Sequence, residues 1–186
     1  MKKKLFTFLL VGVAGLSFGQ GPCSFGTTSD SSSGAENITT GGLYEYAGAA
    51  DFDVPFGTTF TANSMTFNLT KGLASIPYLN VSLRNEQNGL PGDAIMTFDA
   101  LVPTSQVFLY DIPDVSMGCY AVTVNLPSFV TLEKGKYFVQ LTAAAGDDVP
   151  VGWEITLEDQ TYGVFDYFRF ENEPWEEQVI IIRFFR

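Results

Sequence analysis

Histidine is absent from this sequence of 186 residues, and only ten of its residues are basic. The lack of histidine removes the most common general base, the usual serine or cysteine triad and most catalytic zinc sites. The 21 acidic residues outnumber the basic ones and give a net charge of −11 at pH 7. Because phosphate binding needs clustered lysine and arginine, this charge excludes a nucleic acid partner and disfavours an anionic lipid surface.

Cysteine is also scarce, and the chain has two, Cys23 and Cys119. In an oxidising compartment these thiols could form a disulfide closing a long loop, for which chain entropy gives a stabilisation of about 4–5 kcal/mol. Two unpaired thiols are the alternative. The spacing does not decide between them, because a disulfide depends on geometry.

The first nineteen residues have the layout of a bacterial secretory signal peptide. Lys2 to Lys4 form a basic start, an apolar run follows over Leu5–Leu16, and small residues precede a predicted cleavage between Gly19 and Gln20. The apolar run is short for crossing a bilayer, so no membrane span is expected in the mature form. Cleavage removes three of the ten basic residues and no acidic one, which leaves 167 residues with a net charge of −14.

The mature chain begins with a stretch that has little to bury. Residues 20–42 are rich in serine, threonine and glycine, which predicts a flexible lead or an irregular edge segment. From residue 43 to residue 186 the pattern changes to short apolar runs separated by turn residues, which predicts a single domain over this range. No window of a dozen residues shows the 3.6-residue period of a helix.

Apolar and polar residues alternate with a period of two in several runs, as in half-buried strands of antiparallel sheets. The clearest runs are 78–84, 120–126 and 136–142. The phase of the alternation slips at Asn63-Ser64, which predicts a β-bulge or a strand crossing between sheets. Nine or ten such runs, the last of them the apolar stretch 178–185, predict an all-β, two-sheet antiparallel sandwich of jelly-roll-like form.

Two turns are indicated by composition. Residues 88–92 read Asn-Gly-Leu-Pro-Gly, which supplies residues that tolerate a positive φ and one with a fixed φ. Residues 133–136 read Glu-Lys-Gly-Lys between two strong strands, which predicts a short hairpin turn.

Three stretches, taken in order, are similar to a known family. They are Ala49–Pro55 leading into the strand Phe60–Met65, Asn88–Gly92 after the strand Val81–Leu83, and the run Leu132–Leu141. Together they resemble the jelly-roll-like β-sandwich accessory domains of secreted and surface proteins of Bacteroidota. The resemblance covers about residues 43–186 and implies the sandwich fold and an accessory role. It implies no catalytic residues.

Residues 149–177 combine aromatic side chains with acids, and Arg169 is the one basic residue among them. A sugar ring stacks its C–H face on an aromatic ring and uses its hydroxyls for hydrogen bonds, so this composition suits a carbohydrate site. The candidate residues are Trp153, Tyr162 and Trp175. The alternative is that the aromatics fill the core while the acids cover a solvated loop.

Four aspartates are candidate calcium ligands, because carboxylates are the hard oxygen ligands that this ion prefers. Asp51 and Asp53 point to one side of an extended segment, and Asp147 and Asp148 occupy a turn that contains glycine. Neither pair has the spacing of an EF-hand. A purely structural turn is the alternative for both, and no other cofactor is expected.

No motif of a known catalytic type is present, since the sequence lacks a G-x-S-x-G elbow, a phosphate loop and an H-E-x-x-H helix. We therefore expect a secreted, non-catalytic protein, exported across the inner membrane to the periplasm or the cell surface. The leading hypothesis is a protein-interaction or structural subunit of the cell envelope with a protein partner. The rival is a carbohydrate-binding module that binds polysaccharide, and a hydrolase using only carboxylates is a third reading.

Overall fold

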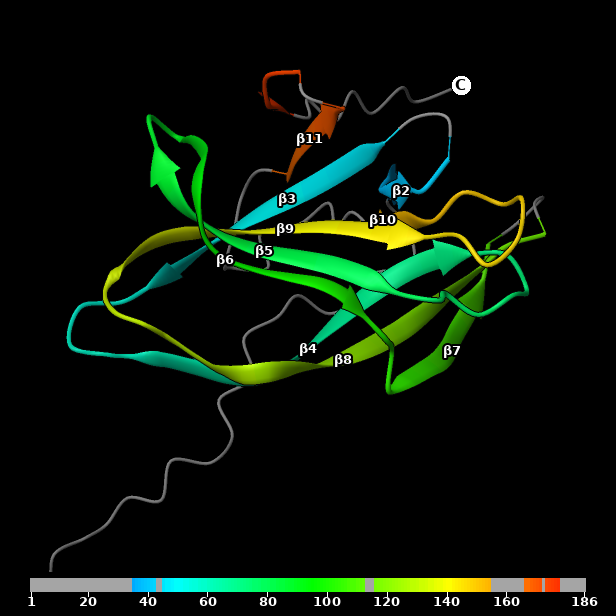
Figure 1. Ribbon diagram of the computed structural model, residues 1–186, viewed down its shortest axis with the longest axis horizontal. Helices are drawn as coiled ribbons and strands as arrows, with labels where there is room; N and C mark the ends of the chain where they lie inside the picture. The colour runs from blue at the N-terminus through cyan, green and yellow to red at the C-terminus, as the bar shows by residue number, and fades with distance from the viewer. Residues whose placement is uncertain (1–34, 43–44, 113–115, 155–165, 172, 178–186) are drawn as a thin grey trace, which may run out of the picture.

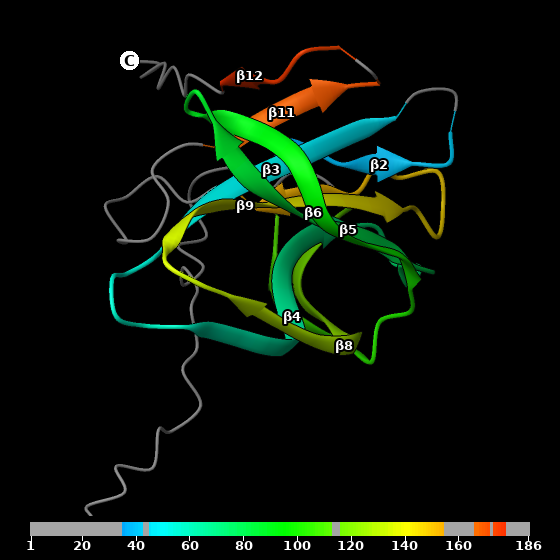
Figure 2. The ribbon, with the colours of Figure 1, turned by 60° about the vertical axis from the view of Figure 1, so that its left-hand side comes forward.

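The computed structural model describes residues 35–42, 45–112, 116–154, 166–171 and 173–177. Two sheets lie against each other in a sandwich (Figures 1 and 2), which confirms the predicted all-β, two-sheet fold. The five-stranded sheet has, in order, β1 (Ala35–Asn37), β10 (Gly152–Glu154), β4 (Phe60–Lys71), β8 (Gly118–Leu132) and β7 (Ser105–Asp111). The second sheet has β12 (Glu176–Glu177), β11 (Asp166–Phe170), β3 (Tyr46–Val54), β9 (Gly135–Ala144), β5 (Leu79–Gln87) and β6 (Leu90–Leu101) in order.

A seventh strand, β2 (Thr39–Thr40), joins the second sheet by pairing with β9 in parallel, whereas the other pairings are antiparallel. The count of strands exceeds the predicted nine or ten, partly because β2 and β12 have only two residues each. In the described ranges no helix is long and apolar enough to cross a membrane.

The core lies between the sheets and is built from the faces that the alternation predicts. Leu79, Val81 and Leu83 of β5 are fully buried there, and Leu141 of β9 packs against the same cluster. Val122 of β8 reaches the cluster from the opposite sheet. Alternation with a period of two thus correctly predicts which side chains of these strands are buried, because each strand has one face on the core.

The sandwich begins earlier than the sequence predicts. The sequence predicts a flexible lead or an irregular edge segment over residues 20–42, yet residues 35–37 and 39–40 form β1 and β2, and Ile38 between them is fully buried. The Ile38 N–H donates to the Val151 carbonyl at 2.9 Å, and its carbonyl accepts the Ala143 N–H at 2.8 Å. Ile38 therefore makes backbone hydrogen bonds toward both sheets. The strand β1 lies at the edge of its sheet, which agrees with the predicted alternative of an edge segment.

The slip of phase at Asn63-Ser64 is a bulge, as predicted. Ala62 pairs with Val130 and Ser64 pairs with Asn125, so Asn63 alone lies opposite the four residues 126–129 of β8. The larger part of the irregularity is therefore in β8, at the four residues that include Pro127, and a proline inside a strand is found mainly at edges or bulges.

The two predicted turns have different outcomes. At the β5–β6 hairpin, Asn88 and Gly89 have φ angles of 55° and 83°, which confirms a tight turn at this point. The turn after Leu132 is not a hairpin, because β8 belongs to the five-stranded sheet and β9 to the seven-stranded one. The chain crosses between the sheets here, beside the connection of β3 to β4. The prediction was wrong because turn composition does not specify with which strands the flanking segments pair.

The predicted closing strand, residues 178–185, lies outside the described residues.

Candidate functional site

The strand β7 forms one edge of the five-stranded sheet and is seen at the lower right of Figure 1. It pairs with β8, with Val107 opposite Ala121 and Phe108 opposite Tyr120. Among the described strands, none pairs with its other edge. An edge strand of this kind presents a row of backbone N–H and C=O groups on which another chain can add a strand.

The side chains of β7 make this edge apolar. Val107, Phe108 and Leu109 are consecutive, and they are 57%, 50% and 41% exposed. Strict alternation would send every second side chain to the core. The pairing of β7 with β8 shifts between Phe108 and Tyr110, so Leu109 is an extra residue that also remains on the surface. Val102, just before the strand, is likewise exposed.

The other described edges are protected in the ways that natural sheets use. The strands β1 and β12 have only three and two residues. The edge strand β6 contains Pro91, which lacks an N–H, and two carboxylates, Asp93 and Asp99. The strand β7 has a single charged residue, Asp111 at its end, and no proline. It is thus the least protected edge of the described sandwich.

The predicted carbohydrate residue Trp153 is partly buried between the two sheets. It is in β10, packs against the main core and meets the ring of Phe67 edge to face at 5.6 Å between centroids. A Cβ atom built on Gly48 of β3 would lie 3.2 Å from the Trp153 ring. The indole therefore fills the space between the two sheets.

The predicted carbohydrate residue Trp175 lies elsewhere, on the outer face of the seven-stranded sheet. It packs against a small second cluster formed by Ala49, Phe138 and Tyr167. The guanidinium of Arg169 lies 4.7 Å from the centre of the Trp175 ring, and a second guanidinium lies 5.8 Å away. Such cation–π contacts hold the indole against the sheet.

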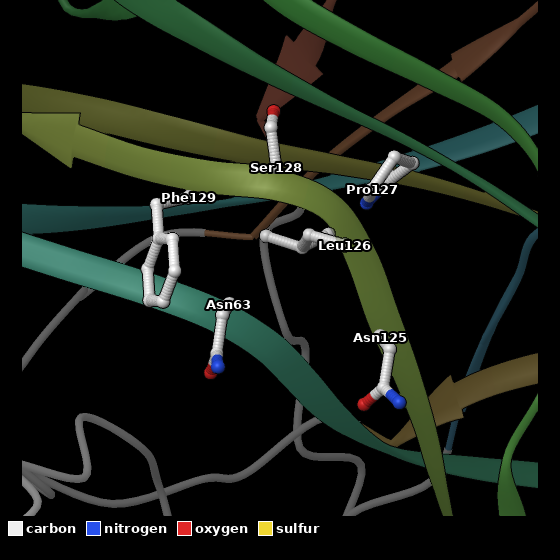
Figure 3. Close-up of a pocket in the computed structure, with 6 residues that line it drawn as sticks. All are labelled: Asn63, Asn125, Leu126, Pro127, Ser128 and Phe129. Carbon is white, nitrogen blue, oxygen red and sulfur yellow. The ribbon is translucent and has the colours of Figure 1, made fainter.

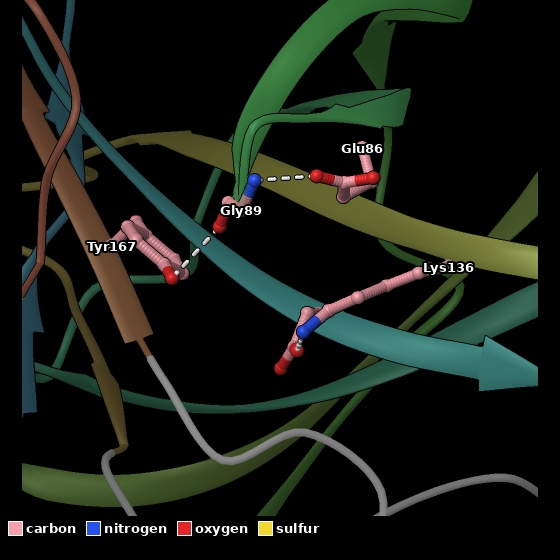
Figure 4. A network of polar contacts seen from close by, with 5 residues as sticks. Glu86, Gly89, Lys136 and Tyr167 are labelled. Atoms are coloured by element: carbon pink, nitrogen blue, oxygen red, sulfur yellow. Dashed lines mark hydrogen bonds and ion pairs between the residues drawn. The ribbon is translucent and has the colours of Figure 1, made fainter.

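The second of these guanidiniums belongs to Arg84 of β5. Burial, and next the proximity of Arg169, lower the pKa of Arg84. Its Nε donates to the Gln140 side chain at 2.6 Å. Nearby, Tyr167 donates to the Gly89 carbonyl at 3.0 Å, which ties β11 to the tip of the β5–β6 hairpin (Figure 4).

The seven-stranded sheet separates Trp153 from Trp175. Gly48 of β3 faces Trp153, whereas the next residue, Ala49, faces Trp175 on the opposite side of the same strand. The two indoles thus do not form one platform for a sugar. The third candidate, Tyr162, lies outside the described residues.

The candidate calcium ligand Asp51 is buried on β3 and forms an ion pair with Lys136 of β9. Hydrogen bonding to Asp51 is the main cause that raises the pKa of Lys136, and Asp53, which is exposed on the same side of β3, adds to it. Two carboxylates on one side of a strand are therefore observed, as predicted, and a lysine lies beside them.

The candidate ligand Asp147 joins two loops. Its Oδ2 accepts the Ala74 N–H at 3.0 Å, and its Oδ1 accepts the Val149 N–H at 3.1 Å. These two backbone donors lower the pKa of Asp147 below its ordinary value. The neighbouring Asp148 is exposed. Among the described residues, no three His, Cys, Asp or Glu side chains are grouped to hold a metal ion, so calcium binding stays a prediction.

We expect Asp147→Ala to reduce stability at neutral pH and to have little effect in acid. The pKa of Asp147 is depressed in the folded state, so the stabilisation by its carboxylate is fully present above its ordinary pKa of 3.8 and is lost as the pH falls through the folded pKa. Urea unfolding of both proteins as a function of pH measures this. A difference between them that is the same at pH 3 and pH 7 would contradict the role of the carboxylate.

Cys119 is fully buried in β8 and has no disulfide partner among the described residues. Burial is the main cause that raises its pKa, and nearby Glu154 raises it further, while a hydrogen bond with Tyr110 acts in the opposite direction. Glu154 is itself buried and accepts hydrogen bonds from Tyr110 and from the Asn68 side chain. The predicted partner Cys23 lies outside the described residues, so the disulfide stays a prediction.

The exposed edge at β7 is not predicted by the sequence. The only local signal is three consecutive apolar residues without a neighbouring lysine or arginine, and this signal is the same for a buried strand.

In comparisons with protein families, with curated proteins and with solved structures, nothing matches this chain.

Proposed function

We propose that this protein is a secreted β-sandwich that acts through contact with another protein, as an interaction or structural subunit of the cell envelope. The observation that carries the proposal is the edge strand β7, with Val107, Phe108 and Leu109 exposed and no basic residue or proline to protect it. Strand addition to such an edge gives affinity through backbone hydrogen bonds and specificity through the side chains.

The charge of the chain limits the chemistry of the partner. The strand itself is almost neutral, whereas the mature chain is expected to carry a net charge of −14. A partner that adds an extended apolar segment, with lysine or arginine at its ends, would match both features. Attraction between the charges would raise the rate of association at low salt and would fall with ionic strength.

We expect the double variant Val107→Lys/Leu109→Lys to lose at least tenfold in affinity for the partner, because two ammonium groups would have to be desolvated in an apolar contact. The measurement uses the tagged mature protein in its native host, gentle solubilisation of the envelope and quantification of what co-purifies in a fixed ratio.

Leu73→Lys is the matched control, because Leu73 is 90% exposed and lies outside the described strands. It should co-purify with the same partner as the wild-type protein. The proposal fails if the wild-type protein is a monomer without a partner, or if the β7 variant retains its partner as well as the control does.

A further inference from the structure

The bulge between β4 and β8 holds a small hollow that no part of the proposed function uses. It is lined by six residues, Asn63, Asn125, Leu126, Pro127, Ser128 and Phe129, and has a volume of about 290 Å³ (Figure 3). That size is at the lower end of the range for small-molecule sites, which suits a ligand of one or two rings.

The two ends of the bulge are firmly held. Val130 is fully buried in the main core, and Leu126 is also buried there. On either side, Ala62 and Ser64 of β4 continue the ladder with β8. The side chains between these points are thus carried on a fixed backbone, and a ligand would not need to order a loop on binding.

The groups in the hollow are an aromatic ring and neutral hydrogen-bonding side chains. Phe129 is 68% exposed, so one face of a large apolar ring is open to solvent. In Figure 3 the Phe129 ring lies beside Asn63, and the carboxamides of Asn63 and Asn125 project to the same side of the two strands. Both asparagines are exposed, and within the described part of the chain neither carboxamide has a hydrogen-bond partner.

The six lining residues include no charged side chain, although the chain has 31 charged residues. A carboxylate or phosphate ligand would find no cation among them. A carboxamide offers both donors and acceptors, which matches hydroxyl groups that also do both. An aromatic face beside such amides is complementary to a sugar ring, whose C–H face is apolar and whose rim is hydroxylated.

We propose that this hollow binds a neutral pyranose residue, stacked on Phe129 and hydrogen-bonded by Asn63 and Asn125. The site is separate from the β7 edge, because β7 pairs with residues 118–123 of β8 and the hollow begins at Asn125. It also differs from the predicted site at Trp153, Tyr162 and Trp175. Carbohydrate binding at the bulge can therefore be tested independently of the proposed protein contact at β7.

The test is titration of the ¹⁵N-labelled mature protein with the methyl glycosides of glucose, galactose and mannose, followed through the side-chain amide signals of Asn63 and Asn125. We expect these signals to shift with at least one of the three sugars, with a Kd in the millimolar range. Phe129→Ala should weaken that binding roughly tenfold through loss of stacking. Glucuronic acid should bind more weakly than the neutral sugars.

Phe56→Ala is the matched control, since Phe56 is a phenylalanine that is 85% exposed and does not line the hollow. It should bind the sugar as the wild-type protein does. The proposal is overturned if none of the neutral glycosides shifts the two amide signals, or if Phe129→Ala binds with unchanged affinity. Preferential binding of an apolar peptide over every sugar would also overturn it.

Discussion

Trp153→Ala should lower the free energy of unfolding by about 3 kcal/mol, because it leaves a cavity between the two sheets. The indole is in edge-to-face contact with Phe67 and approaches Gly48 of the opposite sheet so closely that no larger residue fits there without a shift. Chemical denaturation followed by far-UV circular dichroism measures the loss, since the far-UV signal does not depend on the removed fluorophore.

Trp175→Ala is the control for this prediction, because it removes the other tryptophan from the outer face of the second sheet. It loses contacts with two guanidiniums and with the small outer cluster, and we expect a loss of about 1 kcal/mol. If instead Trp153→Ala kept full stability and abolished retention on a polysaccharide, the indole would be a ligand platform. That result would contradict the packing described for Trp153.

The strands could be predicted from the sequence because their information is local. Alternation in 78–84 and 136–142 identifies the core face without knowledge of any partner, and Leu79, Val81 and Leu83 are indeed buried together. The bulge at Asn63 could be located for the same reason. The pairing of strands is not local, which is why the sequence predicts a hairpin after Leu132 although this turn joins two sheets.

The candidate sites depend on this non-local information. Whether Val107, Phe108 and Leu109 are core or surface depends on the position of β7 at the end of its sheet, which no local pattern encodes. The hollow at the bulge needs Asn63 of β4 and residues 125–129 of β8 to lie together. The composition of residues 149–177 predicts one site formed by several aromatic side chains, whereas Trp153 and Trp175 are on opposite sides of one sheet.

The outer face of the seven-stranded sheet shows the limit of alternation most clearly. In β9 the pattern assigns Tyr137, Val139 and Leu141 to the core, which leaves Phe138 facing outward. Phe138 is nevertheless fully buried, because Tyr167 packs on it edge to face at 5.4 Å and Trp175 covers the same cluster. A second, smaller core thus lies on the outer face of the seven-stranded sheet, where Tyr167 of β11 and Trp175 pack on Phe138.

Phe138→Ala should therefore be among the most damaging single changes, with a loss of about 3–5 kcal/mol in the free energy of unfolding. Phe129→Ala removes the same side chain from an exposed position and should change stability by no more than about 0.5 kcal/mol. Urea unfolding of the two variants beside the wild-type protein measures this. If the loss of unfolding free energy in Phe138→Ala were as small as that in Phe129→Ala, the second core would not stabilise the fold. A large loss in Phe138→Ala alone would mean that the side chains of Tyr167 and Trp175 complete the folded domain by covering an aromatic side chain on the outer face of the seven-stranded sheet.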